Sequence, residues 1–161
     1  MAHCEQEQQL YLVQEYIDGE NLAEELAENG VWNETDIREL LNGILPVLKF
    51  VYDNNVIHRD IKPENIIKTR NTQTFVLVDF GAAKYITGTA LLKTGTIIGV
   101  PNYASDEQSI GKAIFASDLY SLGLTCLHLL TNVNPWDLYD GNEGKWIWRN
   151  YLTTPINEEL G

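Results

Sequence analysis

The chain has 161 residues, enough for one domain with a hydrophobic core, and its 44% hydrophobic and 21% charged residues are ordinary globular usage. The net charge of −12 argues against nucleic acid binding as the main function. It does not exclude a nucleotide ligand, because metal ions bridge carboxylates to phosphates.

The most apolar stretch, residues 119–130, is too short to span a bilayer and predicts a buried helix. We see no secretory signal in the first residues. The two cysteines, Cys4 and Cys126, lie far apart, and Cys126 is expected to be a buried free thiol. These features indicate a reducing, cytoplasmic location.

The N-terminal part begins with nine polar residues, which we expect to form a frayed tail. A strand-like apolar run follows at residues 10–13. Since a lone strand is not stable and no strong strand pattern follows before residue 56, we expect part of the structure to be missing upstream.

Two helices are predicted next, a short acidic one over residues 21–28 and a longer one whose 3.6-residue apolar period runs over residues 37–51. The cap of the longer helix is Asn33 or Thr35. Pro46 lies inside it and predicts a kink or a break.

The C-terminal part predicts two more helices. Ser117 could cap a helix from Asp118 to about Leu130. The aromatic stretch at residues 144–152 predicts one more short helix.

Two motifs occupy the middle of the chain. Residues 58–65 (His-Arg-Asp-Ile-Lys-Pro-Glu-Asn) lie between β-branched pairs at 56–57 and 66–67, which predicts a loop held by two short strands. Residues 79–81 (Asp-Phe-Gly) follow the apolar run at 75–78. Loops on a rigid scaffold are where catalytic groups tend to lie.

With these motifs, Glu107 and the run at residues 118–123, the chain resembles the hinge and large lobe of a serine/threonine protein kinase of the bacterial type. The resemblance implies an α+β, mainly helical fold, the large C-terminal lobe with short β-strand pairs. It implies that residues 10–161 are a partial kinase domain, truncated before its last helices, behind a polar tail at residues 1–9.

The resemblance also implies the catalytic roles. Asp60 would accept the proton of the attacking hydroxyl, and Lys62 would place a positive charge beside the transferring phosphate. Asn65 and Asp79 would supply oxygen ligands to Mg²⁺, with ATP as the nucleotide. His58 would pack rather than act as a base.

For the adenine, the resemblance implies hydrogen bonds from the Glu15 carbonyl and the Ile17 amide, with Ile67 against the ring. The phosphate end of the nucleotide would meet the same Lys62, Asn65 and Asp79. Arg59 implies control by phosphorylation of the following Thr-rich loop, whose candidate acceptors are Thr87, Thr89, Thr94 and Thr96.

The chain departs from the family in three places. No Gly-x-Gly-x-x-Gly set occurs in it, so we expect the small lobe to be absent and the isolated chain to be inactive or nearly so. Val100 replaces a Thr, and residues 105–106 replace Ala-Pro. The usual Arg partner of Glu107 would lie beyond residue 161, so Glu107 is expected to be solvated or otherwise paired. Asp118 is expected to anchor the catalytic loop through backbone donors.

The sequence therefore predicts transfer of the ATP γ-phosphoryl group to protein Ser or Thr, with no nucleic acid partner and no membrane span. A small lobe that is missing or encoded separately is a possible partner. The alternative is a truncated pseudokinase that acts as a scaffold or binding module, and a small-molecule phosphotransferase fits the motifs less well. The substrate protein stays open.

Overall fold

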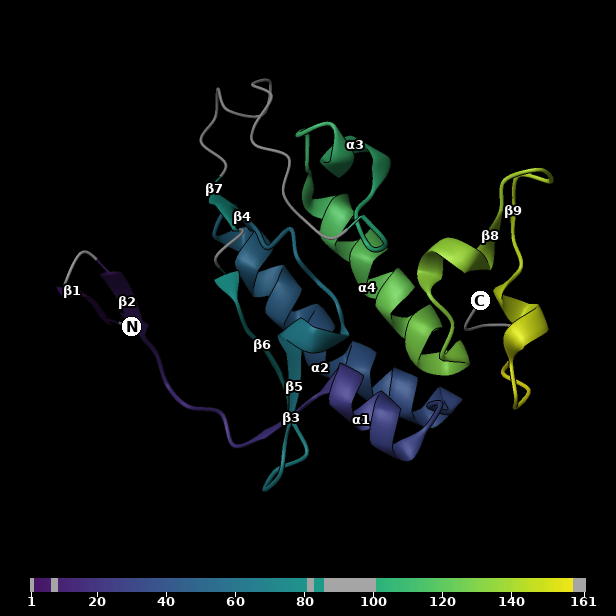
Figure 1. The fold of residues 1–161 in the computed structure, drawn as a ribbon, viewed down its shortest axis with the longest axis horizontal. Coiled ribbons are helices and arrows are strands. Elements are labelled where there is room, and N and C mark those ends of the chain that lie inside the picture. Colours follow the sequence, from purple (N-terminus) through teal and green to yellow (C-terminus); the bar gives the residue numbers. More distant parts are fainter. Residues whose placement is uncertain (1, 7–8, 81–82, 86–100, 158–161) are drawn as a thin grey trace.

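The computed structural model describes residues 2–6, 9–80, 83–85 and 101–157. The described part is mainly helical and carries short antiparallel strand pairs, which confirms the predicted α+β class (Figure 1). The helices are α1 (Leu22–Asn29), α2 (Glu34–Asp53), α3 (Asp106–Ser109) and α4 (Phe115–Thr131), with 3₁₀ turns η1 (Pro63–Asn65), η4 (Pro135–Leu138) and η5 (Trp148–Tyr151).

The strands form small, separate antiparallel ladders. The ladders are β1 (Ala2–Gln6) with β2 (Gln9–Val13), β3 (Gly19–Asn21) with β5 (Ile66–Thr69) and β6 (Phe75–Leu77), β4 (Val56–Ile57) with β7 (Lys84–Tyr85), and β8 (Tyr139–Asp140) with β9 (Lys145–Trp146).

The expectation of a frayed tail at residues 1–9 is wrong, because Ala2–Gln6 forms strand β1. It pairs with β2 in a hairpin, from Ala2 opposite Val13 to Gln6 opposite Gln9. The strand-like run therefore has a partner within the chain, and the backbone hydrogen bonds of the hairpin outweigh the polar composition of the first residues.

Both predicted N-terminal helices form, and each begins at an asparagine cap. The side chain of Asn21 accepts hydrogen bonds from the first turn of α1, and that of Asn33 does the same for α2. Each cap is completed by an acidic side chain three residues on, Glu24 or Asp36, that accepts from the cap's own amide. Helix α2 continues through Pro46, so the break that was one of the two expectations does not occur.

The predicted start of α4 was three residues late, because the helix begins at Phe115. Ser117 is not its cap. The Ser117 hydroxyl lies in the first turn, where it accepts a hydrogen bond from the Ile114 amide and donates one to Glu107. The stretch at residues 144–152 forms the short strand β9 and the 3₁₀ turn η5 instead of a helix.

The core lies where α1, α2 and α4 meet the three-stranded ladder, and its buried members include Leu26, Leu40, Ile44, Ile66, Leu77, Leu122 and Leu129. Ile61, from the middle of the 58–65 loop, is also buried in this core. Burial of one such side chain stabilises a fold by about 1.5–3 kcal/mol. The 58–65 loop is thus anchored to the core by the buried side chain of Ile61.

Candidate active site

The loop at residues 58–65 is anchored by hydrogen bonds to the carboxylate of Asp118 in α4. Its Oδ2 accepts the amide hydrogen of His58 and its Oδ1 that of Arg59, each at 2.8 Å. Arg59 has a φ of 70°, a left-handed conformation that costs energy for a residue with a side chain. Two charge-assisted hydrogen bonds offset that cost, which confirms the expected anchoring role of Asp118.

Burial and hydrogen bonding have opposite effects on the pKa of Asp118. Burial raises the pKa of Asp118 above its usual value, while the backbone hydrogen bonds from Arg59 and His58 pull it down. The two amide donors stabilise the ionised form of the carboxyl, which burial disfavours.

The imidazole of His58 joins the loop to the strand that precedes Asp79. Its Nδ1 lies 3.3 Å from the Asp60 amide, which can only donate, and its Nε2 lies 3.0 Å from the Val78 carbonyl, which can only accept. The neutral tautomer with its proton on Nε2 satisfies both contacts. Burial lowers the pKa of His58, which favours this neutral form.

His58 also packs on the aromatic ring of the Asp-Phe-Gly motif. The rings of His58 and Phe80 meet edge to face, with centroids 4.6 Å apart. The prediction that His58 packs is confirmed, and both of its ring nitrogens have partners within the protein.

Three of the predicted site residues meet directly. The Nδ2 of Asn65 donates to the backbone oxygen of Asp60 at 2.7 Å and to its Oδ2 at 2.8 Å. The ammonium of Lys62 lies 3.2 Å from the same Oδ2. No described residue donates to the other oxygen, Oδ1, so the carboxylate is fixed on one side and available on the other.

Asp79 joins this group through the backbone. The amide of Val78, the residue before Asp79, donates to the Asn65 carbonyl at 2.9 Å. This hydrogen bond joins the end of the 58–65 loop to the start of the Asp-Phe-Gly motif. Asp79 has a φ of 59°, and its side chain is exposed at the start of the turn. A left-handed aspartate is an uncommon conformation, which the chain accepts here where it turns out of the strand.

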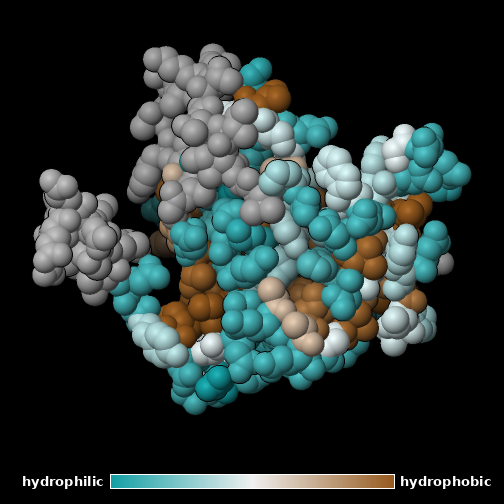
Figure 2. All heavy atoms as spheres, in the orientation of Figure 1, coloured by the Kyte–Doolittle hydropathy of each residue, from teal (hydrophilic) through white to brown (hydrophobic). Residues whose placement is uncertain are grey.

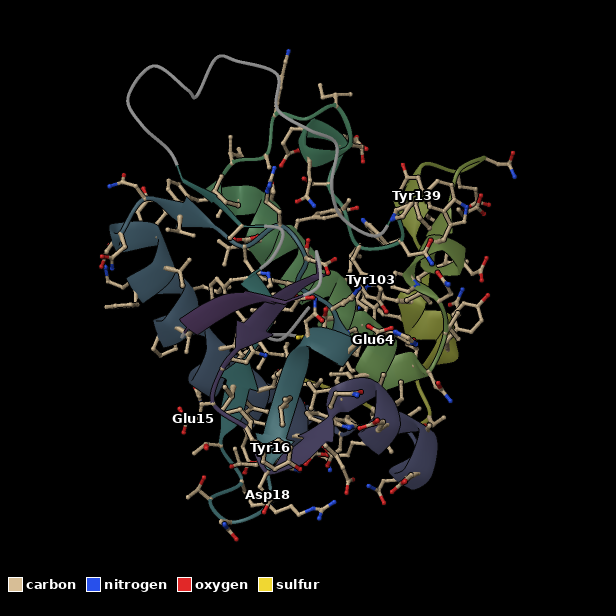
Figure 3. All side chains as sticks on the ribbon, turned by 60° about the vertical axis from the view of Figure 1, so that its left-hand side comes forward. Glu15, Tyr16, Asp18, Glu64, Tyr103 and Tyr139 are labelled. Atoms are coloured by element: carbon tan, nitrogen blue, oxygen red, sulfur yellow. The ribbon has the colours of Figure 1, made fainter. Side chains whose placement is uncertain are left out.

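The remaining predicted residues line an open hollow of about 580 Å³ beside this group. Its wall includes Glu15 and Ile17 from the segment after β2, Ile67 from β5, and Asp79 with Phe80. Figure 2 shows hydrophobic residues gathered over β5 and β6, and Figure 3 shows Glu15 on the adjoining segment. The hollow is therefore apolar along its strands and acidic at its Asp79 end.

Comparison with known proteins gives the family. The family model described as Protein kinase domain matches residues 1–157. The chain belongs to the protein kinase family. It is 40% identical over 156 residues to the serine/threonine-protein kinase PknA of Nostoc sp. and 42% identical over 154 residues to serine/threonine-protein kinase C of Synechocystis sp..

The two alignments cover 93% and 92% of this chain but 28% and 29% of the relatives, so the chain spans less than a third of their length. Both relatives are named as serine/threonine protein kinases, and protein kinases as a family use ATP and Mg²⁺. Within the described residues, no helix is long and apolar enough to cross a membrane.

The side chains of Asn65 and Asp79 are suited to bind Mg²⁺ together with a nucleotide. Both donor hydrogens of Asn65 Nδ2 have acceptors on Asp60, so the amide oxygen turns away from Asp60 and keeps its lone pairs. Together with the exposed carboxylate of Asp79, it offers two hard oxygen donors. No group of three or more His, Cys, Asp or Glu able to hold a metal occurs among the described residues. A two-ligand site suits Mg²⁺, which keeps waters and phosphate oxygens as its other ligands.

The end of the activation segment is tied to the catalytic loop by Gln108, a residue that the sequence did not single out. The Gln108 amide nitrogen donates to the Arg59 carbonyl at 2.6 Å. Glu107 accepts the Ser117 hydroxyl at 2.6 Å, which confirms that it is otherwise paired. Glutamine carries no sequence signal for such a contact, and only the fold brings it there.

The predicted phosphorylation sites lie outside the described residues. These sites are Thr87, Thr89, Thr94 and Thr96. Val100, which replaces a Thr of the family, also lies outside the described residues.

Cys126 is a buried free thiol, as expected, and burial raises its pKa to about 12.

Proposed function

We propose that the protein transfers the γ-phosphoryl group of ATP to a Ser or Thr hydroxyl of a protein, with Asp60, Lys62, Asn65 and Asp79 as its catalytic residues. The observation that carries the proposal is the asymmetric environment of Asp60. Its Oδ2 is held by Lys62 and Asn65, and its Oδ1 has no donor from the described residues.

This arrangement suits the acceptance of one proton. The substrate hydroxyl oxygen forms a bond to the γ-phosphorus as the bond to the ADP oxygen breaks, and the hydroxyl proton passes to Asp60 Oδ1. Because Oδ2 is already occupied, the carboxylate cannot rotate away from the hydroxyl. Lys62, whose ammonium lies 3.2 Å from Asp60 Oδ2, would neutralise charge on the phosphoryl oxygens.

In this proposal Asn65 and Asp79 hold Mg²⁺, which when bound neutralises phosphate charge. Glu15, Ile17 and Ile67 bind the adenine through the hollow that they line. Residues 10–161 then form the hinge and large lobe of the domain. The Gly-rich loop that kinases place over the phosphates does not occur among the 161 residues, so these alone are expected to turn over well below the roughly 1 s⁻¹ of ordinary kinases.

The test compares Asp60→Asn with wild type in the full-length protein, using γ-labelled ATP and a Ser-containing protein substrate. We expect kcat to fall by about 100-fold or more, the usual contribution of a general base, with little change in the affinity for ATP. Glu39→Gln is the matched control, because Glu39 is exposed on α2, forms no ion pair with a described residue and loses the same charge.

Transfer by Asp60→Asn at a rate within a few-fold of wild type would refute the role of Asp60. A wild-type protein that binds Mg²⁺–ATP but transfers no phosphate would instead favour the scaffold alternative.

A further inference from the structure

Tyr103, at the end of the activation segment, is joined to His128 of α4 by a short hydrogen bond. The phenol oxygen lies 2.6 Å from Nδ1 of the imidazole, and the centroids of the two rings lie 6.1 Å apart. Tyr103 is 7% exposed, and its hydroxyl has no other partner among the described residues. The phenol proton therefore needs Nδ1 as its acceptor, which fixes His128 in the neutral tautomer that carries its proton on Nε2.

A carboxylate of the catalytic loop acts on this pair. Glu64, in the 3₁₀ turn η1, is exposed, and its negative charge raises the pKa of Tyr103 and opposes the lowering of the pKa of His128 (Figure 3). Burial has the larger effect on His128 and lowers its pKa, which favours the neutral imidazole. The elements α2, η4 and η5 also pack on α4, but their charged side chains, Asp137 of η4 and Arg149 of η5 among them, do not contribute to the pKa of His128.

Protonation of His128 is incompatible with the hydrogen bond from Tyr103. An imidazolium carries a hydrogen on each nitrogen, so Nδ1 can no longer accept the phenol proton. The buried hydroxyl is then left without an acceptor, which is unfavourable, while the new positive charge is attracted to the Glu64 carboxylate. The neutral and the protonated imidazole therefore favour different partners, the Tyr103 hydroxyl and the Glu64 carboxylate.

Tyr103 is one of the points that hold the end of the activation segment. Its carbonyl accepts the hydroxyl of Ser121 in α4 at 2.8 Å. Five residues further on, Gln108 donates to the Arg59 carbonyl of the catalytic loop at 2.6 Å. Residues 101–109 thus connect α4 to the catalytic loop, and loss of the bond between Tyr103 and His128 weakens that connection at its α4 end.

We propose that His128 is a pH switch, which on protonation exchanges the Tyr103 hydroxyl for the Glu64 carboxylate and so loosens residues 101–109 from α4. The loosened segment slows phosphoryl transfer, a consequence that rests on the proposed function. The sign follows from burial, since a histidine whose folded-state pKa lies below its usual 6.5 gains its proton only as the pH falls below about 6.5. The segment is therefore held at neutral pH and loosened in acid.

The test is hydrogen–deuterium exchange of the full-length protein, followed by mass spectrometry of the peptides that cover residues 101–109. Rates at pH 7.5 and 5.5 are each divided by the intrinsic rate of an unstructured chain at that pH. In the wild type, the corrected exchange should be about 2- to 10-fold faster at pH 5.5, which corresponds to the loss of one hydrogen bond. His128→Gln should abolish this difference, because the glutamine amide oxygen accepts the phenol proton and does not titrate.

Further variants test the partners of the switch. Tyr103→Phe lacks the hydroxyl and should exchange fast at both pH values, whereas Tyr151→Phe, which removes an exposed phenol hydroxyl from η5, should behave as the wild type. Glu64→Gln removes the competing carboxylate and should move the transition to lower pH. Circular dichroism checks that the variants are folded, and His58, which also titrates, is present in all of them. Exchange that does not change with pH in the wild type, or that changes equally in His128→Gln, overturns the proposal.

A second measurement decides whether the switch controls transfer. The value of kcat/KM for a Ser-containing protein substrate is compared between the wild type and His128→Gln at the same two pH values. Titration of Asp60 is common to both proteins, so their ratio isolates His128, and we expect the wild type to lose about 2- to 10-fold relative to His128→Gln at pH 5.5. An unchanged ratio, with the exchange difference intact, refutes the control of transfer. Absence of transfer by the wild type at either pH, with the exchange difference intact, refutes the proposed function and leaves the switch standing.

Discussion

Replacing Asp118 with Asn tests the anchoring of the catalytic loop. The carboxylate is 5% exposed and accepts two backbone hydrogen bonds at 2.8 Å. Asparagine keeps one acceptor oxygen and turns an NH₂ group toward the other backbone N–H. Each charge-assisted hydrogen bond contributes about 1.5–3 kcal/mol, and one is lost outright, while the other becomes a neutral hydrogen bond worth about 0.5–1.5 kcal/mol. Relief from burying a charge offsets part of this, so we expect a net loss of about 2–3 kcal/mol.

The assay is urea unfolding of the full-length protein, followed by the fluorescence of its tryptophans. A loss of this size lowers the midpoint of the kinase domain by about 1 M for an m-value of about 2–3 kcal/mol/M. Asp137→Asn is the matched control, since Asp137 is exposed and its replacement should cost less than about 0.5 kcal/mol. A free energy of unfolding for Asp118→Asn within 0.5 kcal/mol of wild type would show that the two hydrogen bonds do not support the loop.

Two further predictions concern stability. Since burial lowers the folded-state pKa of His58 below its usual 6.5, the unfolded chain binds the proton more tightly, and stability is lost as the pH falls below about 6.5. His58→Phe should reduce this loss between pH 7.5 and 5.5 in urea midpoints, and an equal loss in both proteins would contradict it. Asn33→Ala removes the cap of α2 and should cost about 1 kcal/mol, whereas Asn42→Ala, exposed in the same helix, should cost nothing.

Local features were the ones that the sequence could predict. The caps at Asn21 and Asn33 depend on side chains two or three residues away, so the pattern itself contains the partners. The order of the motifs likewise identified the fold class and the residues around Asp60. These predictions need no knowledge of how distant segments pack.

The features that sequence reasoning missed depend on distant partners. Ser117 looks like a cap, but its hydroxyl is used by Glu107 ten residues earlier and α4 starts before it. Gln108 gains its role from a carbonyl 49 residues away. Pro46 does not end α2, because the apolar face on either side of it is buried in one continuous core.

The hydrogen bonds that Asp118 accepts determine when the loop gains its support during synthesis. Its partners precede it by 60 and 59 residues, so the loop gains its support only after α4 has been made and has packed against α2. A nascent chain that ends at the Asp-Phe-Gly motif contains every residue of the proposed catalytic set but lacks this support. We therefore expect nucleotide affinity to arise late on the ribosome, together with docking of α4 and not with translation of the motifs.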